Sequence, residues 1–109
     1  MVAKKLPEKV TSKVKKYIKT LKKDNVPIFG VYVFGSFAKG TQHKWSDIDV
    51  CVVSSAFKNA WSSSKYLWKK RSDDVYLTIE PVGFTPKDFK EESSSLIHEI
   101  KRNGIKIEA

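Results

Sequence analysis

Cysteine is almost absent from this sequence, which has 109 residues and a single thiol at Cys51. One cysteine cannot form an internal disulfide and cannot supply a cysteine-rich metal site. Long apolar runs are absent as well: no stretch approaches the roughly 18 consecutive apolar residues of a membrane span, and the N-terminal segment lacks the apolar core of a signal peptide. These absences predict one soluble, cytoplasmic domain over residues 1–109 with no membrane association.

Acidic charge is scarce at the N-terminal end. Residues 1–25 hold nine lysines against Glu8 and Asp24, whereas the rest of the chain is close to balance within a formal net charge of +9. A basic leading segment could favour nucleic acid, nucleotide phosphates or an acidic protein partner. A solvated helix face is the preferred interpretation, and nucleic acid ranks last among the partners.

The spacing of apolar residues predicts an α/β (α+β) fold, with a mixed sheet of about four strands and helices packed on it. Helices are expected over 7–24, over 57–68, from Thr85 with Pro86 in its first turn, and over 96–103. Strands are expected over 28–34, 48–53, 75–82 and 105–108. Pro81 places the third strand at an edge of the sheet or itself near the strand end.

Two carboxylates, Asp47 and Asp49, lie one residue apart around the start of the second strand. Because side chains alternate along a strand, they share one face while Ile48 and Val50 point into the core. Two ionised carboxylates repel each other and Asp is disfavoured in strands, so the pair needs compensating positive charge. Mg²⁺, with Mn²⁺ as the alternative ion, would supply it. A solvent-facing polar edge is the structural alternative.

A Gly35-Ser36 pair follows the first apolar run. Glycine lets the backbone turn sharply and approach a ligand, and backbone amides with the Ser36 hydroxyl can donate to a phosphate. Taken alone, the pair is an ordinary turn. A third carboxylate would complete a two-metal site, and Glu80 in the third apolar run is the candidate. Asp73 and Asp74 are alternatives that fit turn positions better.

Structural roles are preferred for the other polar and aromatic side chains. His43 is expected in an exposed loop and His98 on the surface, while Cys51 is expected as a small buried residue beneath the Asp pair rather than as a nucleophile. Three tryptophans could stack on a base, but packing in the core or against a partner is the preferred interpretation. They are Trp45, Trp61 and Trp68.

The two motifs together resemble the signature of the DNA polymerase beta-like nucleotidyltransferase superfamily, nearest to its minimal (MNT-type) members. The matching residues are Gly35-Ser36-Phe37-Ala38-Lys39-Gly40 and Ser46-Asp47-Ile48-Asp49-Val50. The resemblance implies a single minimal nucleotidyltransferase domain with the polymerase beta-like fold. It assigns nucleotide binding to Gly35, Ser36 and Lys39, and two Mg²⁺ ions and catalysis to Asp47, Asp49 and Glu80. Lys39 stands where minimal members often have Arg, which keeps the charge but loses the planar fork.

The activity that the resemblance implies is transfer of a nucleoside monophosphate, with AMP from ATP expected, to an acceptor with release of pyrophosphate. The chain has no room for an acceptor-binding domain, so a second copy or another protein must provide that surface. Minimal members are often encoded beside a helical HEPN-type protein, which implies a homo-oligomer or a hetero-oligomer with such a partner. The alternative function is a non-catalytic binding or antitoxin module that neutralises the HEPN-type partner.

Overall fold

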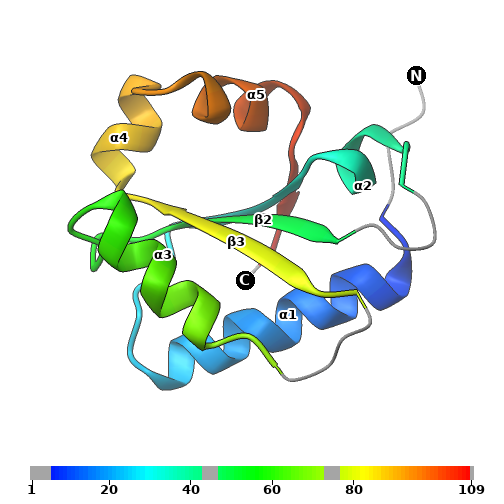
Figure 1. Cartoon of the computed structure of the whole chain (residues 1–109), viewed down its shortest axis with the longest axis horizontal. Coiled ribbons are helices and arrows are strands. Elements are labelled where there is room, and N and C mark those ends of the chain that lie inside the picture. The colour runs from blue at the N-terminus through cyan, green and yellow to red at the C-terminus, as the bar shows by residue number, and fades with distance from the viewer. Residues whose placement is uncertain (1–5, 43–46, 73–76, 109) are drawn as a thin grey trace.

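A computed structural model of the chain describes residues 6–42, 47–72 and 77–108. Nine elements follow one another along these residues (Figure 1). The helices are α1 (Glu8–Lys23), α2 (Ser36–Lys39), α3 (Ala60–Lys69), α4 (Pro86–Glu91) and α5 (Ser95–Asn103). The strands are β1 (Gly30–Phe34), β2 (Ile48–Val53), β3 (Ile79–Phe84) and β4 (Ile105–Ile107). None of the helices in this described part is both long and apolar enough to cross a membrane.

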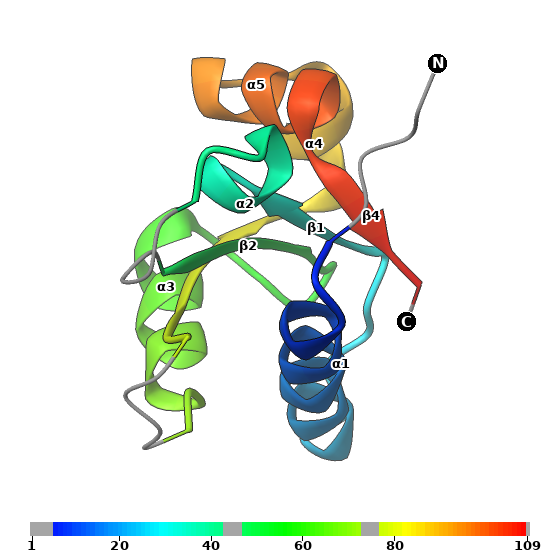
Figure 2. The same ribbon diagram turned by 90° about the vertical axis from the view of Figure 1, so that its right-hand side faces the viewer.

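The four strands form one mixed sheet in the order β3-β2-β1-β4. β1 pairs antiparallel with β2 and with β4, whereas β2 and β3 run parallel. Helices α4 and α5 cover one face of the sheet, and α1 and α3 lie on the other side (Figure 2). The predicted mixed sheet of four strands with packed helices is therefore confirmed.

Alternation along the strands divides the apolar side chains between two clusters. On β2, Ile48, Val50 and Val52 are fully buried against α1 and belong to the larger cluster. Cys51 and Val53 point to the opposite face and belong to the smaller cluster under α4 and α5. Asp47 and Asp49 have the parity of Cys51, so the strand directs them to the helix-covered face that carries the smaller cluster.

Side-chain caps begin three of the described helices, α3, α4 and α5. Thr85 Oγ1 accepts from the Asp88 amide at 3.1 Å, which confirms the predicted start of α4 with Pro86 in its first turn. Asn59 Oδ1 accepts from the Ser62 amide at 2.8 Å and begins α3. This cap corrects the prediction that the helix starts at 57, because a capping residue lies outside the helical conformation.

The third strand begins later than predicted and extends to residue 84, two residues past its expected end. Residues 75 and 76 lie outside the described residues. Pro81 lies in the middle of β3, and β3 is an edge strand, so the second of the two predicted alternatives is confirmed. The carbonyls of Thr78 and Phe84 accept hydrogen bonds from the β2 side. The backbone N–H and C=O groups of the odd-numbered residues of β3 therefore point away from β2. Because Pro81 is one of these residues, its missing N–H removes no hydrogen bond of the sheet.

Side chains of α3 cover this outer edge of β3. Ser63 Oγ donates to the Gly83 carbonyl at 3.5 Å. Trp68 Nε1 donates to the Pro81 carbonyl at 3.1 Å, and Arg71 Nη1 donates to the Ile79 carbonyl at 3.5 Å. Each outward carbonyl of β3 from 79 to 83 thus has a side-chain donor, which protects the edge from pairing with another strand.

Candidate active site

Asp47 and Asp49 lie at the start of β2, at the end of the sheet where β1 turns into α2. Asp47 is exposed just before the strand, and Asp49 is half-buried within it. The antiparallel register pairs Asp49 with Phe34, the last residue of β1. This pairing brings the predicted carboxylates beside the predicted Gly35-Ser36 turn.

Glu80 lies on the neighbouring strand, directly across from Asp49. The parallel register pairs these two residues, so their side chains leave the sheet on the same face. The Glu80 carboxyl group lies close enough to those of Asp47 and Asp49 to interact with both. The structure therefore brings together the three carboxyl groups that the sequence singled out.

The pKa values of two of these carboxyl groups, Asp49 and Glu80, are raised. Burial raises the pKa of Glu80, and its hydrogen bonds and the negative charges of Asp47 and Asp49 raise it further. Burial also raises the pKa of Asp49, as do the charges of Asp47 and Glu99, while the hydrogen bond with Glu80 acts in the opposite direction. Both directions mean that ionising these carboxyl groups together is unfavourable.

The carboxyl groups lie next to one another and do not surround a common centre. Among the residues that the structure describes, no group of three His, Cys, Asp or Glu side chains is already positioned to hold a metal ion. Ionisation of all three groups would place like charges next to one another. The cluster would then carry three negative charges, which a cation would stabilise.

Gly35 provides the space that Asp49 occupies. Its backbone has φ 71° and ψ −147°, a conformation almost restricted to glycine. A Cβ on this residue would collide with Asp49 Oδ2 and lie 3.0 Å from Asp49 Cγ. Gly35 is also the N-cap of α2, so the first amides of that helix begin beside the carboxylates.

Lys39, predicted to bind the nucleotide, forms an ion pair in the last turn of α2. Its Nζ lies 2.9 Å from Glu99 Oε1 on α5, with both side chains about half exposed. Glu99 is a charged residue near the site that sequence reasoning missed. It is 50 residues from Asp49 in the chain and lies on an ordinary amphipathic helix, so no local motif pointed to it.

The other sequence candidates are outside the cluster. Cys51 is fully buried, and burial raises its pKa to about 12, which confirms a filler rather than a nucleophile. His98 is exposed, as predicted, with Nδ1 at 2.8 Å from Glu92 Oε1. Trp61 and Trp68 are exposed, so core packing is wrong for both of them. Four further candidates lie outside the described residues: His43, Trp45, Asp73 and Asp74.

Two concave regions of the described residues lie away from the carboxylates. A cavity of about 640 Å³ lies between α1 and the start of β3, and another of about 660 Å³ lies between α1 and β4. Ile79 lines the first cavity from the face of β3 opposite to Glu80. We locate the candidate active site at the carboxylates, because phosphate chemistry depends on placed charge more than on concavity.

Comparison with known proteins identifies the family of this chain. Residues 12–107 match the family model of the nucleotidyltransferase domain. Protein adenylyltransferase MntA of Shewanella oneidensis is 51% identical over 39 residues, which is 35% of this chain and 27% of that relative. The matched segment thus spans only about a quarter of the relative's length.

Two solved structures share the fold. A candidate nucleotidyltransferase from Sulfolobus solfataricus has a TM-score of 0.65 at 15% identity, covering 90% of this chain and 78% of that one, and shows the fold alone. A toxin-antitoxin structure with AMP-PNP has a TM-score of 0.57 at 26% identity, covering 91% and 73%. The resemblance inferred from the sequence motifs is confirmed.

Proposed function

From the premise that this chain belongs to the nucleotidyltransferase domain family, we propose that it transfers AMP from ATP to a hydroxyl group of a partner protein. The observation that supports this most is the cluster of Asp47, Asp49 and Glu80 beside the turn at Gly35 and Ser36. Carboxylates placed next to backbone amides provide both a cation site and a phosphate site.

The donor set fits Mg²⁺, with Mn²⁺ as the alternative. All three groups are hard carboxylate oxygens, and burial together with the neighbouring negative charges raises the pKa values of Asp49 and Glu80, which a bound cation would counteract. Asp47 and Asp49 would hold two ions together, and Glu80 would complete the second. When bound, such ions neutralise phosphate charge and make a hydroxyl easier to deprotonate.

Different residues of the chain would bind the phosphates and accept the proton. The Ser36 hydroxyl and the first amides of α2 would donate to the triphosphate, and Lys39 would add a positive charge. Glu80 would accept the proton of the acceptor hydroxyl. The hydroxyl oxygen then bonds to the α-phosphorus as the bond to the β-phosphate breaks and pyrophosphate leaves. A base with a raised pKa suits a proton transfer near neutral pH.

A protein is the proposed acceptor. The relative from Shewanella oneidensis is a protein adenylyltransferase, and the structural relative bound to AMP-PNP is a toxin-antitoxin pair. The partner would be a helical HEPN-type protein in a hetero-oligomer, with a homo-oligomer as the other arrangement. This identity rests on the family resemblance.

The toxin-antitoxin relative also favours a second function, in which the chain neutralises its partner by binding without catalysis. Calorimetry separates the two functions. If ATP with Mg²⁺ shows no binding while the partner binds, the non-catalytic function is correct.

The proposed activity is tested by the double change Asp47→Asn with Asp49→Asn. The chain and its co-purifying protein are incubated with ATP and Mg²⁺, and pyrophosphate release and the partner's mass are measured. We expect a mass gain of one AMP with the unchanged chain and at least about a 10²-fold slower reaction with the double variant. Asp88→Asn, in the first turn of α4, is the matched control and should react normally. Full activity in the double variant would refute the assignment.

A further inference from the structure

The order of the strands sets the direction from which an acceptor reaches the site. Gly35 follows β1, Asp49 lies on β2 and Glu80 on β3, and these three strands are neighbours in that order. In phosphoryl transfer the attacking and leaving oxygens lie roughly in line. With the phosphates at Gly35, as the proposed function has it, the acceptor hydroxyl must come from the β3 side.

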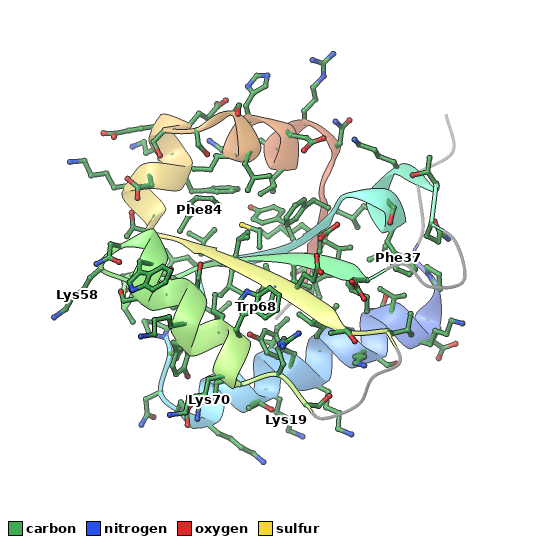
Figure 3. The ribbon with its side chains drawn as sticks, in the orientation of Figure 1. Lys19, Phe37, Lys58, Trp68, Lys70 and Phe84 are labelled. Atoms are coloured by element: carbon green, nitrogen blue, oxygen red, sulfur yellow. The ribbon has the colours of Figure 1, made fainter. Side chains whose placement is uncertain are left out.

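The exposed surface along β3 belongs to α3. Trp61 and Trp68 are 75% and 42% exposed, although both are large apolar side chains. Positions 61, 65 and 68 lie on one side of the helix, and Arg71 follows one turn later. We call these four residues, Trp61, Lys65, Trp68 and Arg71, the indole face. Figure 3 shows the Trp68 ring against β3, with Lys58 projecting outward beyond the start of the helix.

The indole face lies beside β3, the strand that carries the proposed base Glu80. Trp68 donates to the carbonyl of Pro81, and Arg71 donates to that of Ile79. These two carbonyls belong to the residues on either side of Glu80. Because α3 side chains occupy the outward carbonyls of β3, a partner cannot dock here by adding a strand. It must bind through the side chains of the indole face.

The charge of this face favours an acidic partner. The helix contains no Asp or Glu, and Lys65 Nζ lies 5.7 Å from the centroid of the Trp61 ring. The Arg71 guanidinium lies 4.1 Å from the Trp68 ring. Exposed Trp and Arg side chains of this kind provide most of the affinity in many protein interfaces.

Nucleic acid fits the face less well. Base stacking needs free ring faces and mobile cations. Arg71 already covers one side of Trp68, and its Nε donates to the Trp68 carbonyl at 3.2 Å. A fixed Trp–Arg pair can contact a protein carboxylate without rearranging, whereas only Trp61 remains open for stacking.

A second basic region borders the same end of β3. The cavity of about 640 Å³ is lined by Lys16 of α1, with Leu77 and Ile79 in its wall. Lys70 also lines it but is paired with Asp24 at 2.7 Å, so its charge is already balanced. The described lining contains no acidic side chain. A partner lying along β3 therefore meets basic residues on both sides of Arg71.

We propose that the indole face of α3 is the docking surface for an acidic protein segment that carries the acceptor hydroxyl. The segment's carboxylates contact Lys65 and Arg71, and its apolar groups pack on Trp61. Its hydroxyl side chain then passes over the β3 edge to Glu80. This inference rests on the proposed function and adds the chemistry of its acceptor.

The test measures binding in the absence of nucleotide, so that it does not depend on catalysis. A fluorescently labelled random copolymer of glutamate and tyrosine is titrated with the full chain and followed by anisotropy. A lysine–tyrosine copolymer and a single-stranded oligoadenylate RNA are titrated in parallel. The variants are Trp61→Ala and Lys65→Glu, which change exposed side chains. Phe29→Ala, which removes a 61% exposed ring from the loop before β1, is the matched control.

We expect the glutamate–tyrosine copolymer to bind the unchanged chain more tightly than either other probe. Trp61→Ala should weaken binding of this copolymer about tenfold, and Lys65→Glu should weaken it further. The affinity of Phe29→Ala should stay within about twofold of that of the unchanged chain. The Asp47→Asn, Asp49→Asn variant should bind normally while failing in transfer, which separates this proposal from the proposed function. The docking proposal would be overturned if the glutamate–tyrosine copolymer did not bind or if the RNA bound more tightly. It would also be overturned if Phe29→Ala weakened copolymer binding as much as Trp61→Ala.

Discussion

The carboxyl group of Asp49 occupies the space where any residue at position 35 other than glycine would place its Cβ. The two residues are adjacent because the β1–β2 register pairs Asp49 with Phe34. A backbone position and a functional carboxylate thus depend on each other, so a change at Gly35 acts on the site as well as on stability.

Gly35→Ala should lower the free energy of unfolding by about 3 kcal/mol, because the methyl group combines a strained φ with a collision against Asp49. ATP binding should be lost at the same time. Chemical denaturation and calorimetry measure the two effects. Gly40→Ala is the matched control, since Gly40 has a similar φ of 75° but its Cβ would meet nothing within 4 Å. Gly40→Ala should lower the free energy of unfolding by only about 1–2 kcal/mol and should leave ATP binding unchanged. Equal effects of the two changes would contradict the contact.

Without divalent ions, the carboxyl cluster should make stability fall as pH rises. Asp49 and Glu80 have raised pKa values in the folded chain, so each favours folding fully below about pH 4 and loses that contribution as pH rises through its folded pKa. In EDTA at neutral pH, Asp49→Asn should therefore raise Tm by about 4 °C or more. Differential scanning calorimetry across pH tests this, and a lower Tm for the variant would contradict it. Mg²⁺ with ATP should stabilise the unchanged chain and not the variant.

Lys39 must leave or share its contact with Glu99 when a triphosphate binds. An exposed ion pair contributes about 0.2–1 kcal/mol, so Glu99→Gln should tighten ATP binding by no more than about fivefold. Lys39→Met should weaken binding about tenfold, because it removes a charge from the phosphates. Titration calorimetry on both variants tests the pair. Weaker ATP binding in Glu99→Gln would instead mean that Glu99 holds Lys39 in position.

Cys51 should be inert despite its place on the same face as the Asp pair. Its thiol is fully buried with a pKa of about 12, so almost no thiolate exists at neutral pH. Thiol reagents should label the native chain only at the rate of unfolding, and Cys51→Ala should keep the transfer activity. Rapid native labelling, or loss of activity in a folded Cys51→Ala variant, would show that the thiol has a role.

Much of the site could be predicted because its residues belong to short motifs on regular elements. Asp47 and Asp49 share a face through strand parity alone, and Gly35-Ser36 directly follows a strong apolar run. Glu80 was identified as a lone acid in an apolar strand, and the parallel register then placed it opposite Asp49. Each of these inferences used only local spacing.

The parts that sequence reasoning missed depend on contacts between distant segments. Glu99 reaches Lys39 across 60 residues. Trp61 and Trp68 have the spacing of a helix stripe, but among the side chains of α3 whose burial is described, Ser63 and Leu67 are the buried ones. The side of α3 that packs against the sheet provides hydrogen-bond donors to the outward carbonyls of β3. The sequence alone does not show that β3 lies beside this helix.

The central claim is that the carboxyl cluster binds the triphosphate through divalent ions. Calorimetric titration of a non-hydrolysable ATP analogue into the chain, with Mg²⁺ and then with EDTA, tests it most directly. Binding should require Mg²⁺ in the unchanged chain, weaken about 10- to 100-fold in Glu80→Gln, and disappear in Asp47→Asn with Asp49→Asn. Binding of equal strength in EDTA, or in the double variant, would contradict the account.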